Sequence, residues 1–271
     1  MSVLALTLAS TLVSGGAHAA DASPWQVDKR AGIRLIAGNP HADARFRAGL
    51  EIKLEPGWKT YWRYPGDSGV PPRFDFSKSE NVRSVAVMWP APHRHRDESG
   101  TTIVYTDDVI FPLRIVAQDA AKPVLLRLKL DYAICEKLCV PADGEAELVL
   151  DGGASSLDTA LTAAEAQVPK PAKLGDTAPL AVRAVHREAG GAKPRILVDV
   201  AGPEPIDLFA EGPTPDWALP VPDPVGGAPA GLHRFALDVD GVPPGAKTDG
   251  ATLTFTLTSS AGAIEVKAPL D

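Results

Sequence analysis

Two cysteines, Cys135 and Cys139, are the residues of this 271-residue chain whose type and spacing could do chemistry. A disulfide between them closes a loop of about four residues. Loop entropy gives such a loop about 2 kcal/mol of stabilisation, against about 4.7 kcal/mol for a 100-residue loop. A chain of this length has little need of so weak a crosslink. Close sulfurs favour redox exchange instead, because one thiol can resolve a mixed disulfide that the other has formed. A reversible dithiol/disulfide is the favoured interpretation, and a structural disulfide in a noncatalytic interaction module stays open.

The segment before Cys135 has the pattern of a half-buried strand. Leu126, Leu128 and Leu130 alternate with Arg127 and Lys129, so these three leucines share one face. The predicted strand, residues 124–134, leads directly to Cys135, and Pro141 follows the second cysteine. The pair is therefore expected at a strand–turn junction near the surface.

The rest of the chain is predicted to be all-β. Its 26 prolines and 24 glycines punctuate many short segments with strand patterning. We predict two immunoglobulin-like β-sandwich domains, residues 25–152 and 179–271, joined by a short helix and a proline-containing linker at residues 153–178. The expected strands are residues 32–37, 45–54, 82–89, 109–116, 124–134 and 145–150, and then 180–186, 195–200, 207–210, 233–239, 252–258 and 263–268.

The first twenty residues predict export from the cytoplasm. An apolar run there is followed by the small-residue sequence Ala17-His18-Ala19, which fits a signal peptide and its cleavage site. No later apolar run approaches the roughly 20 residues of a membrane span. A net charge of −7 argues against a nucleic-acid partner. The sequence also contains no nucleophile elbow or phosphate-binding loop.

Three segments carry a resemblance to a known family. Residues 132–141 read YAICEKLCVP, residues 57–69 read GWKTYWRYPGDSG, and residues 89–113 begin with WPAP and end with FPL. Together they resemble the periplasmic amino-terminal domain of DsbD-type disulfide reductases, closest to the ScsB (suppressor of copper sensitivity) branch. The C-x3-C spacing fits that branch, whereas DsbD itself has a wider spacing.

The resemblance implies an immunoglobulin-like domain in the periplasm. Such a domain takes electrons from a membrane donor, here encoded elsewhere, and passes them to thioredoxin-like thiol proteins without a cofactor. Carried over, Cys139 forms the intermolecular link and Cys135 resolves it. The aromatic residues of the DsbD loop that covers the cysteines are missing, because the aligned positions here read Asp97-Glu98-Ser99-Gly100.

Several aromatic and acidic residues are candidates for the partner-binding surface or for the covering loop. Strand alternation places Trp58 and Trp62 on one face and Tyr61 on the other. Core packing is the favoured role for these aromatic side chains, and a wall beside the cysteines is the alternative. The full set of candidates is Trp58, Tyr61, Trp62, Asp97, Glu98 and Tyr105.

Two histidines, His93 and His95, could join the cysteines in a Cu(I) or Zn(II) site, because thiolate and imidazole are suitable ligands for both ions. The histidines lie about forty residues from Cys135 and complete no known ligand spacing. A solvated basic loop is therefore the favoured interpretation, and a copper-tolerance module that binds metal through the reduced thiols is the alternative.

Overall fold

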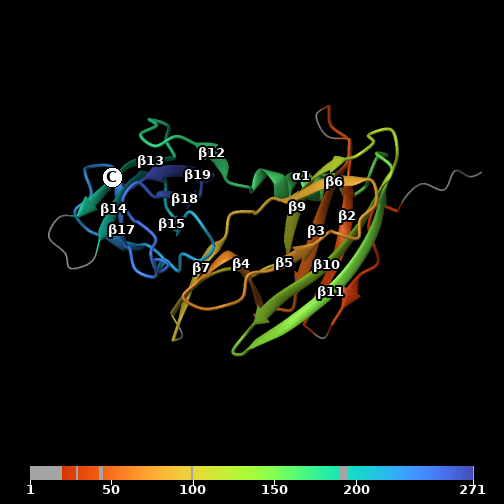
Figure 1. Cartoon of the computed structure of the whole chain (residues 1–271), viewed down its shortest axis with the longest axis horizontal. Coiled ribbons are helices and arrows are strands. Elements are labelled where there is room, and N and C mark those ends of the chain that lie inside the picture. The colour runs from red at the N-terminus through yellow and green to blue at the C-terminus, as the bar shows by residue number, and fades with distance from the viewer. Residues whose placement is uncertain (1–19, 29, 43–44, 99, 189–193, 271) are drawn as a thin grey trace, which may run out of the picture.

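A computed structural model describes residues 20–270 except residues 29, 43–44, 99 and 189–193 (Figure 1). Within this described part the chain forms nineteen strands and one helix, which confirms the all-β prediction. No helix among the described residues is long and apolar enough to cross a membrane. The predicted signal peptide falls almost entirely on residues 1–19, which lie outside the described residues.

The amino-terminal half contains two sheets that pack as a sandwich. The first sheet has the order β1 (Gln26–Val27), β2 (Ala31–Gly38), β3 (Arg47–Leu54), β9 (Val109–Ala117), β6 (Val82–Val87). The second has the order β11 (Cys139–Leu150), β10 (Val124–Cys135), β4 (Lys59–Gly66), β8 (Gly100–Tyr105), β7 (His93–Asp97), and β5 (Arg73–Asp75) pairs with β10.

The core of this sandwich follows from strand alternation. Leu126, Leu128 and Leu130 of β10 are at most 3% exposed, as their alternation with charged residues predicts. At the centre Phe111 is met edge-on by neighbouring aromatic rings at centroid distances of 5.2–5.7 Å, the geometry that aromatic pairs prefer. These rings belong to Phe74, Trp89 and Tyr105.

Strand β11 begins six residues before the predicted start at residue 145. It pairs with β10 over twelve register positions, from Val124↔Leu150 to Cys135↔Cys139. Pro141 and Gly144 lower the strand propensity of its first half, so the sequence pattern gives no signal there. The uninterrupted register opposite β10 extends the strand to Cys139.

The carboxy-terminal half contains two four-stranded sheets around a second apolar core. One has the order β12 (Lys170–Ala172), β19 (Gly262–Pro269), β18 (Thr252–Ser259), β15 (Ile206–Glu211). The other has the order β13 (Ala181–Glu188), β14 (Arg195–Ala201), β17 (His233–Asp238), β16 (Asp223–Val225).

The segment between the two halves is more ordered than a linker. Helix α1 (Asp158–Ala166) packs Leu161 into the amino-terminal half, and both ends of the helix hold Arg47 through Asp158 and Glu165. The proline-containing stretch predicted as a linker forms β12, which pairs in parallel with β19. The domain boundaries stay predictions, while the sheets themselves divide between residues 26–150 and 170–269.

The two halves lie along the long axis of the molecule and share a packed contact (Figure 1). The Trp62 ring lies 5.9 Å from that of Phe209, which belongs to the same buried cluster as the amino-terminal core. Arg63 of β4 forms ion pairs with Glu211 and Glu265 at 2.7 and 2.6 Å. Strand β4 therefore belongs to the amino-terminal sheet and also anchors the other half.

Candidate functional site: a disulfide at the tip of a hairpin

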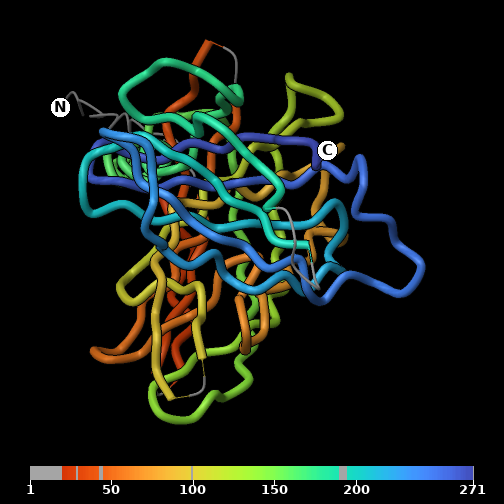
Figure 2. Tube along the Cα trace, turned by 90° about the vertical axis from the view of Figure 1, so that its left-hand side faces the viewer, coloured from red at the N-terminus to blue at the C-terminus, as the bar shows by residue number. Residues whose placement is uncertain are grey.

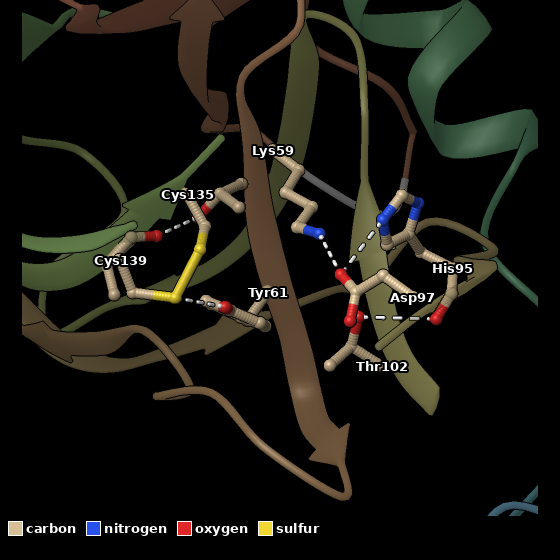
Figure 3. The surroundings of a disulfide bond; sticks show 9 residues. Lys59, Tyr61, His95, Asp97, Thr102, Cys135 and Cys139 are labelled. Atoms are coloured by element: carbon tan, nitrogen blue, oxygen red, sulfur yellow. Dashed lines mark hydrogen bonds and ion pairs between the residues drawn. A yellow bond between two sulfur atoms is a disulfide. The ribbon is translucent and has the colours of Figure 1, made fainter. Parts of the chain in front are cut away.

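The cysteine pair closes the turn of the β10–β11 hairpin. Cys135 is the last residue of β10 and Cys139 the first of β11, and the two are register partners joined by a disulfide (Figure 3). Residues 136–138 form the turn. Figures 1 and 2 both place this turn at the lower end of the molecule, beside the end of β7. The structure thus places the pair at a strand–turn junction, as the sequence predicts.

The two sulfur-bearing residues differ in exposure. Cys135 is 6% exposed and packs in a small cluster with Tyr61, Val104 and Ala133. Cys139 is exposed, and its neighbour Leu138 is 80% exposed. Because exchange requires an attacking sulfur to reach the disulfide, a protein partner has access at Cys139 and not at Cys135.

The hydroxyl of Tyr61 lies 3.0 Å from Cys139 Sγ (Figure 3). A disulfide sulfur carries no hydrogen, so the tyrosine hydroxyl is the donor. Tyr61 is 1% exposed, and its burial, together with the negative charge of Asp97, raises the pKa of its hydroxyl. The group therefore stays protonated at neutral pH and remains able to donate to a sulfur anion at Cys139.

A glycine lets the neighbouring loop close over Tyr61. Gly69 has a φ of +115°, a backbone conformation that residues with a side chain rarely adopt. A Cβ at this position would also overlap the Tyr61 ring. The Gly-Asp-Ser-Gly sequence, which begins at the last residue of β4, thus packs against the tyrosine ring beside the disulfide.

The register of β4 against β10 sets which side chains face the sulfurs. Lys59 pairs with Cys135 and Thr60 with Ile134, and the Thr60 hydroxyl donates to the carbonyl of Ala133 at 2.9 Å. Alternation then puts Lys59 and Tyr61 on the disulfide side and Trp62 in the core.

An ion-pair group lies next to the disulfide. The Lys59 ammonium is buried and lies 3.2 Å from Asp97 Oδ2, which is also 3.3 Å from His95 Nε2 (Figure 3). This group joins β7 to β4 and brings Asp97 close enough to influence Tyr61. Glu98 is exposed in the turn that follows β7. The role of these acidic residues as a cover for the cysteines stays a prediction.

The aromatic candidates separate into core and site. Trp62 is fully buried and Tyr105 is 5% exposed, with its hydroxyl donating to the carbonyl of Pro90 at 2.8 Å. Both side chains lie in the amino-terminal core, the favoured role for these aromatic residues, and their partner-binding or lid role stays a prediction. Trp58 is partly buried, and the Arg30 guanidinium lies 5.1 Å from its ring centroid. Tyr61 alone of the four contacts a sulfur.

The two histidines lie in a strand and not in the predicted basic loop. His93 and His95 belong to β7, a strand whose sequence has no apolar alternation. The side chains between and after them, Arg94 and Arg96, form ion pairs with Asp207 and Asp223 of the other half. His93 lines an open cavity of about 600 Å³ between the halves, whereas His95 binds Asp97. No group of three or more metal-ligating side chains occurs in the described part of the chain. Cu(I) binding by the reduced thiols stays a prediction, which metal analysis after anaerobic reduction would test.

Two site residues are not singled out by the sequence. Lys59 shares the face of Tyr61 by strand alternation, which is the signal that could have found it. Leu138 is an apolar residue in a short turn between two cysteines, where polar residues are usual.

Comparison with known proteins agrees with this geometry. Residues 31–151 match the family model described as "Thiol:disulfide interchange protein DsbD, N-terminal". This segment is therefore similar to DsbD-type amino-terminal domains, as the sequence resemblance indicates. No curated protein matches the chain.

A solved structure extends the similarity to most of the chain. The crystal structure of the N-terminal periplasmic domain of ScsB from Proteus mirabilis matches with a TM-score of 0.69 and 20% sequence identity. The match covers 93% of this chain and 98% of that one. Both halves thus share the fold of the ScsB amino-terminal domain.

Proposed function

We propose that this chain is a periplasmic thiol–disulfide exchange domain that passes two electrons from Cys135 and Cys139 to thioredoxin-like thiol proteins. The observation that carries the proposal is the pairing of an exposed Cys139 with a buried Cys135 at the tip of a hairpin. The match of residues 31–151 to a thiol:disulfide interchange family supports the same chemistry.

In the first step of the reaction, the Cys139 thiolate attacks one sulfur of a disulfide in the partner. A bond forms between Cys139 Sγ and that sulfur, and the second sulfur of the partner leaves as a thiolate and takes a proton. The exposure of Cys139 supports its role as the attacking residue, which the family resemblance also implies.

In the second step, the Cys135 thiolate attacks Cys139 Sγ. The Cys135–Cys139 bond re-forms, and the partner sulfur leaves as a thiolate. The partner has gained two electrons and the domain has lost two. Since Cys135 and Cys139 are register partners, the resolving sulfur is held next to the mixed disulfide.

Tyr61 acts as a positioning residue for this chemistry. Its hydroxyl donates toward Cys139 Sγ and would stabilise the thiolate form, which lowers the pKa of that thiol. The ion pair between Lys59 and Asp97 places a buried ammonium on the same face of β4. A membrane electron donor would return the two electrons to the pair.

The periplasmic location rests on two observations. The ScsB domain of similar fold is described as periplasmic, and the first twenty residues read as a signal peptide. An oxidising compartment is also where a protein disulfide persists between reaction cycles.

Redox cycling with an intact fold tests the proposal. Dithiothreitol should reduce the pair without unfolding the protein. The reduced protein should then reduce oxidised thioredoxin, and the fluorescence change of thioredoxin on reduction measures this transfer. Circular dichroism before and after reduction reports the fold. A folded, reduced protein that transfers no electrons to any thioredoxin-like protein would sink the proposal.

A further inference from the structure

The side chain of Leu138 is exposed to an unusual degree. It is 80% exposed, more than any other large hydrophobic side chain in the described part of the chain, and it lies between the two cysteines. Its position in a hairpin turn leaves it outside both apolar cores. Single exposed hydrophobic residues are common, so exposure alone indicates no function. Leu138 is of interest because it lies beside the exposed sulfur.

A second exposed apolar residue belongs to the segment that packs against Tyr61. Val70 is 48% exposed and follows Gly69, whose backbone lies against the Tyr61 ring. The hydroxyl of that ring is 3.0 Å from Cys139 Sγ. Leu138 directly precedes Cys139, and Val70 is linked to the same sulfur through Gly69 and Tyr61. We name these two residues the apolar rim.

The geometry of a mixed disulfide brings a partner onto this rim. Cysteines joined by a disulfide have Cα atoms about 5.5 Å apart, whereas consecutive Cα atoms are about 3.8 Å apart. Residues next to the partner's cysteine therefore lie within side-chain reach of Leu138 while the mixed disulfide exists. The turn also carries the adjacent exposed charges of Glu136 and Lys137, which have opposite sign and offset each other.

We propose that the apolar rim is a docking surface for thiol proteins that carry an apolar surface around the reactive cysteine. This proposal rests on the proposed function and deepens it, because it names the property of the partner that the domain selects. Burial of Leu138 in the mixed disulfide would stabilise the encounter, while a small thiol reagent, which covers little of the rim, gains nothing from it.

Paired kinetics on a rim variant test this. The reduced Leu138→Ser protein and the reduced wild type each react with oxidised thioredoxin, and separately their oxidised forms react with dithiothreitol. We expect the thioredoxin rate constant of the variant to fall about tenfold, the equivalent of about 1.4 kcal/mol. The dithiothreitol rate should stay within about twofold, and Val70→Ser should show a smaller loss of the same kind.

Val149→Ser is the matched control. Val149 is 46% exposed on β11 and pairs with Leu125 at the opposite end of the same hairpin. The reduced Val149→Ser protein should react with oxidised thioredoxin at the wild-type rate. A Leu138→Ser protein as fast as wild type with thioredoxin, or one equally slowed with dithiothreitol, would overturn the docking surface while leaving the exchange function standing. A wild type that reacts with dithiothreitol but with no thioredoxin-like protein would overturn both.

Discussion

The two ends of strand β4 contact different parts of the molecule. Toward its carboxy-terminal end, Arg63 binds two carboxylates of the other half, and Tyr64 donates a hydrogen bond to the carbonyl of Leu219. At its amino-terminal end, Tyr61 offers one hydrogen bond to the exposed Cys139. One strand thus anchors the scaffold with charge at one end and leaves a reactive sulfur accessible at the other. Substitutions at the carboxy-terminal end of β4 should therefore change the stability of the fold, whereas substitutions beside Cys139 should change the reactivity of its sulfur.

The largest expected effect is on the anchored end. Arg63→Ala leaves Glu211 and Glu265 without their shared partner, and all three side chains are at most 31% exposed. We expect a loss of about 3 kcal/mol in the free energy of unfolding, measured by urea denaturation, because an unpaired, largely buried charge is costly. The rate of disulfide reduction by dithiothreitol should not change.

The matched control for that substitution is Arg127→Ala. Arg127 also binds two carboxylates, Glu80 and Glu147, but these are 66% and 56% exposed. Its loss should cost about 1 kcal/mol or less, because exposed ion pairs contribute little. Equal losses of unfolding free energy in the two variants would contradict the view that Arg63 anchors β4 because its ion pairs are largely buried.

The next effect concerns the disulfide as a crosslink. A variant with both Cys135 and Cys139 changed to Ala should lose about 2 kcal/mol of stability in the same denaturation experiment, because the closed loop is short. The hairpin keeps its register through eleven further pairs. A loss much larger than this would favour the structural disulfide of a noncatalytic module.

A smaller effect is expected from the hydroxyl beside the sulfur. Tyr61→Phe removes the donor to Cys139 and should raise the pKa of that thiol by about one unit, the equivalent of about 1.4 kcal/mol. The measurement is the pH profile of alkylation of the reduced protein. Since burial and Asp97 raise the pKa of Tyr61, its hydroxyl should stay protonated while the thiol titrates. An identical thiol pKa in both proteins would contradict the positioning role.

Much of the fold could be predicted because its strands are amphipathic or apolar. The leucines of β10 alternate with charged residues, and the structure buries them as the pattern requires. Strand β7 escaped prediction because its arginines are satisfied by carboxylates more than a hundred residues away. The parallel pairing of β12 with β19 is equally non-local, and its prolines suggested a linker.

The site could be predicted only in part. The spacing of Cys135 and Cys139 indicated that the two sulfurs can pair, because closeness in sequence guarantees closeness in space. The contact of Tyr61 with Cys139 spans 78 positions and depends on the register of β4 against β10, which one sequence does not encode locally. The unequal exposure of the two sulfurs also arises from packing around Cys135.

Trapping with single-cysteine variants tests most directly the claim that Cys139 exchanges and Cys135 resolves. Reduced Cys135→Ser and Cys139→Ser proteins are incubated with a thioredoxin variant that keeps one active-site cysteine, activated as a mixed disulfide with thionitrobenzoate, which leaves as the thiolate. Adducts are counted by mass spectrometry under non-reducing conditions. We predict that the Cys135→Ser protein accumulates a mixed disulfide through Cys139, since that sulfur is exposed and neither protein keeps a second cysteine that could resolve the bond. The Cys139→Ser protein should form little adduct. Equal trapping by both variants, or preferential trapping through Cys135, would contradict the account.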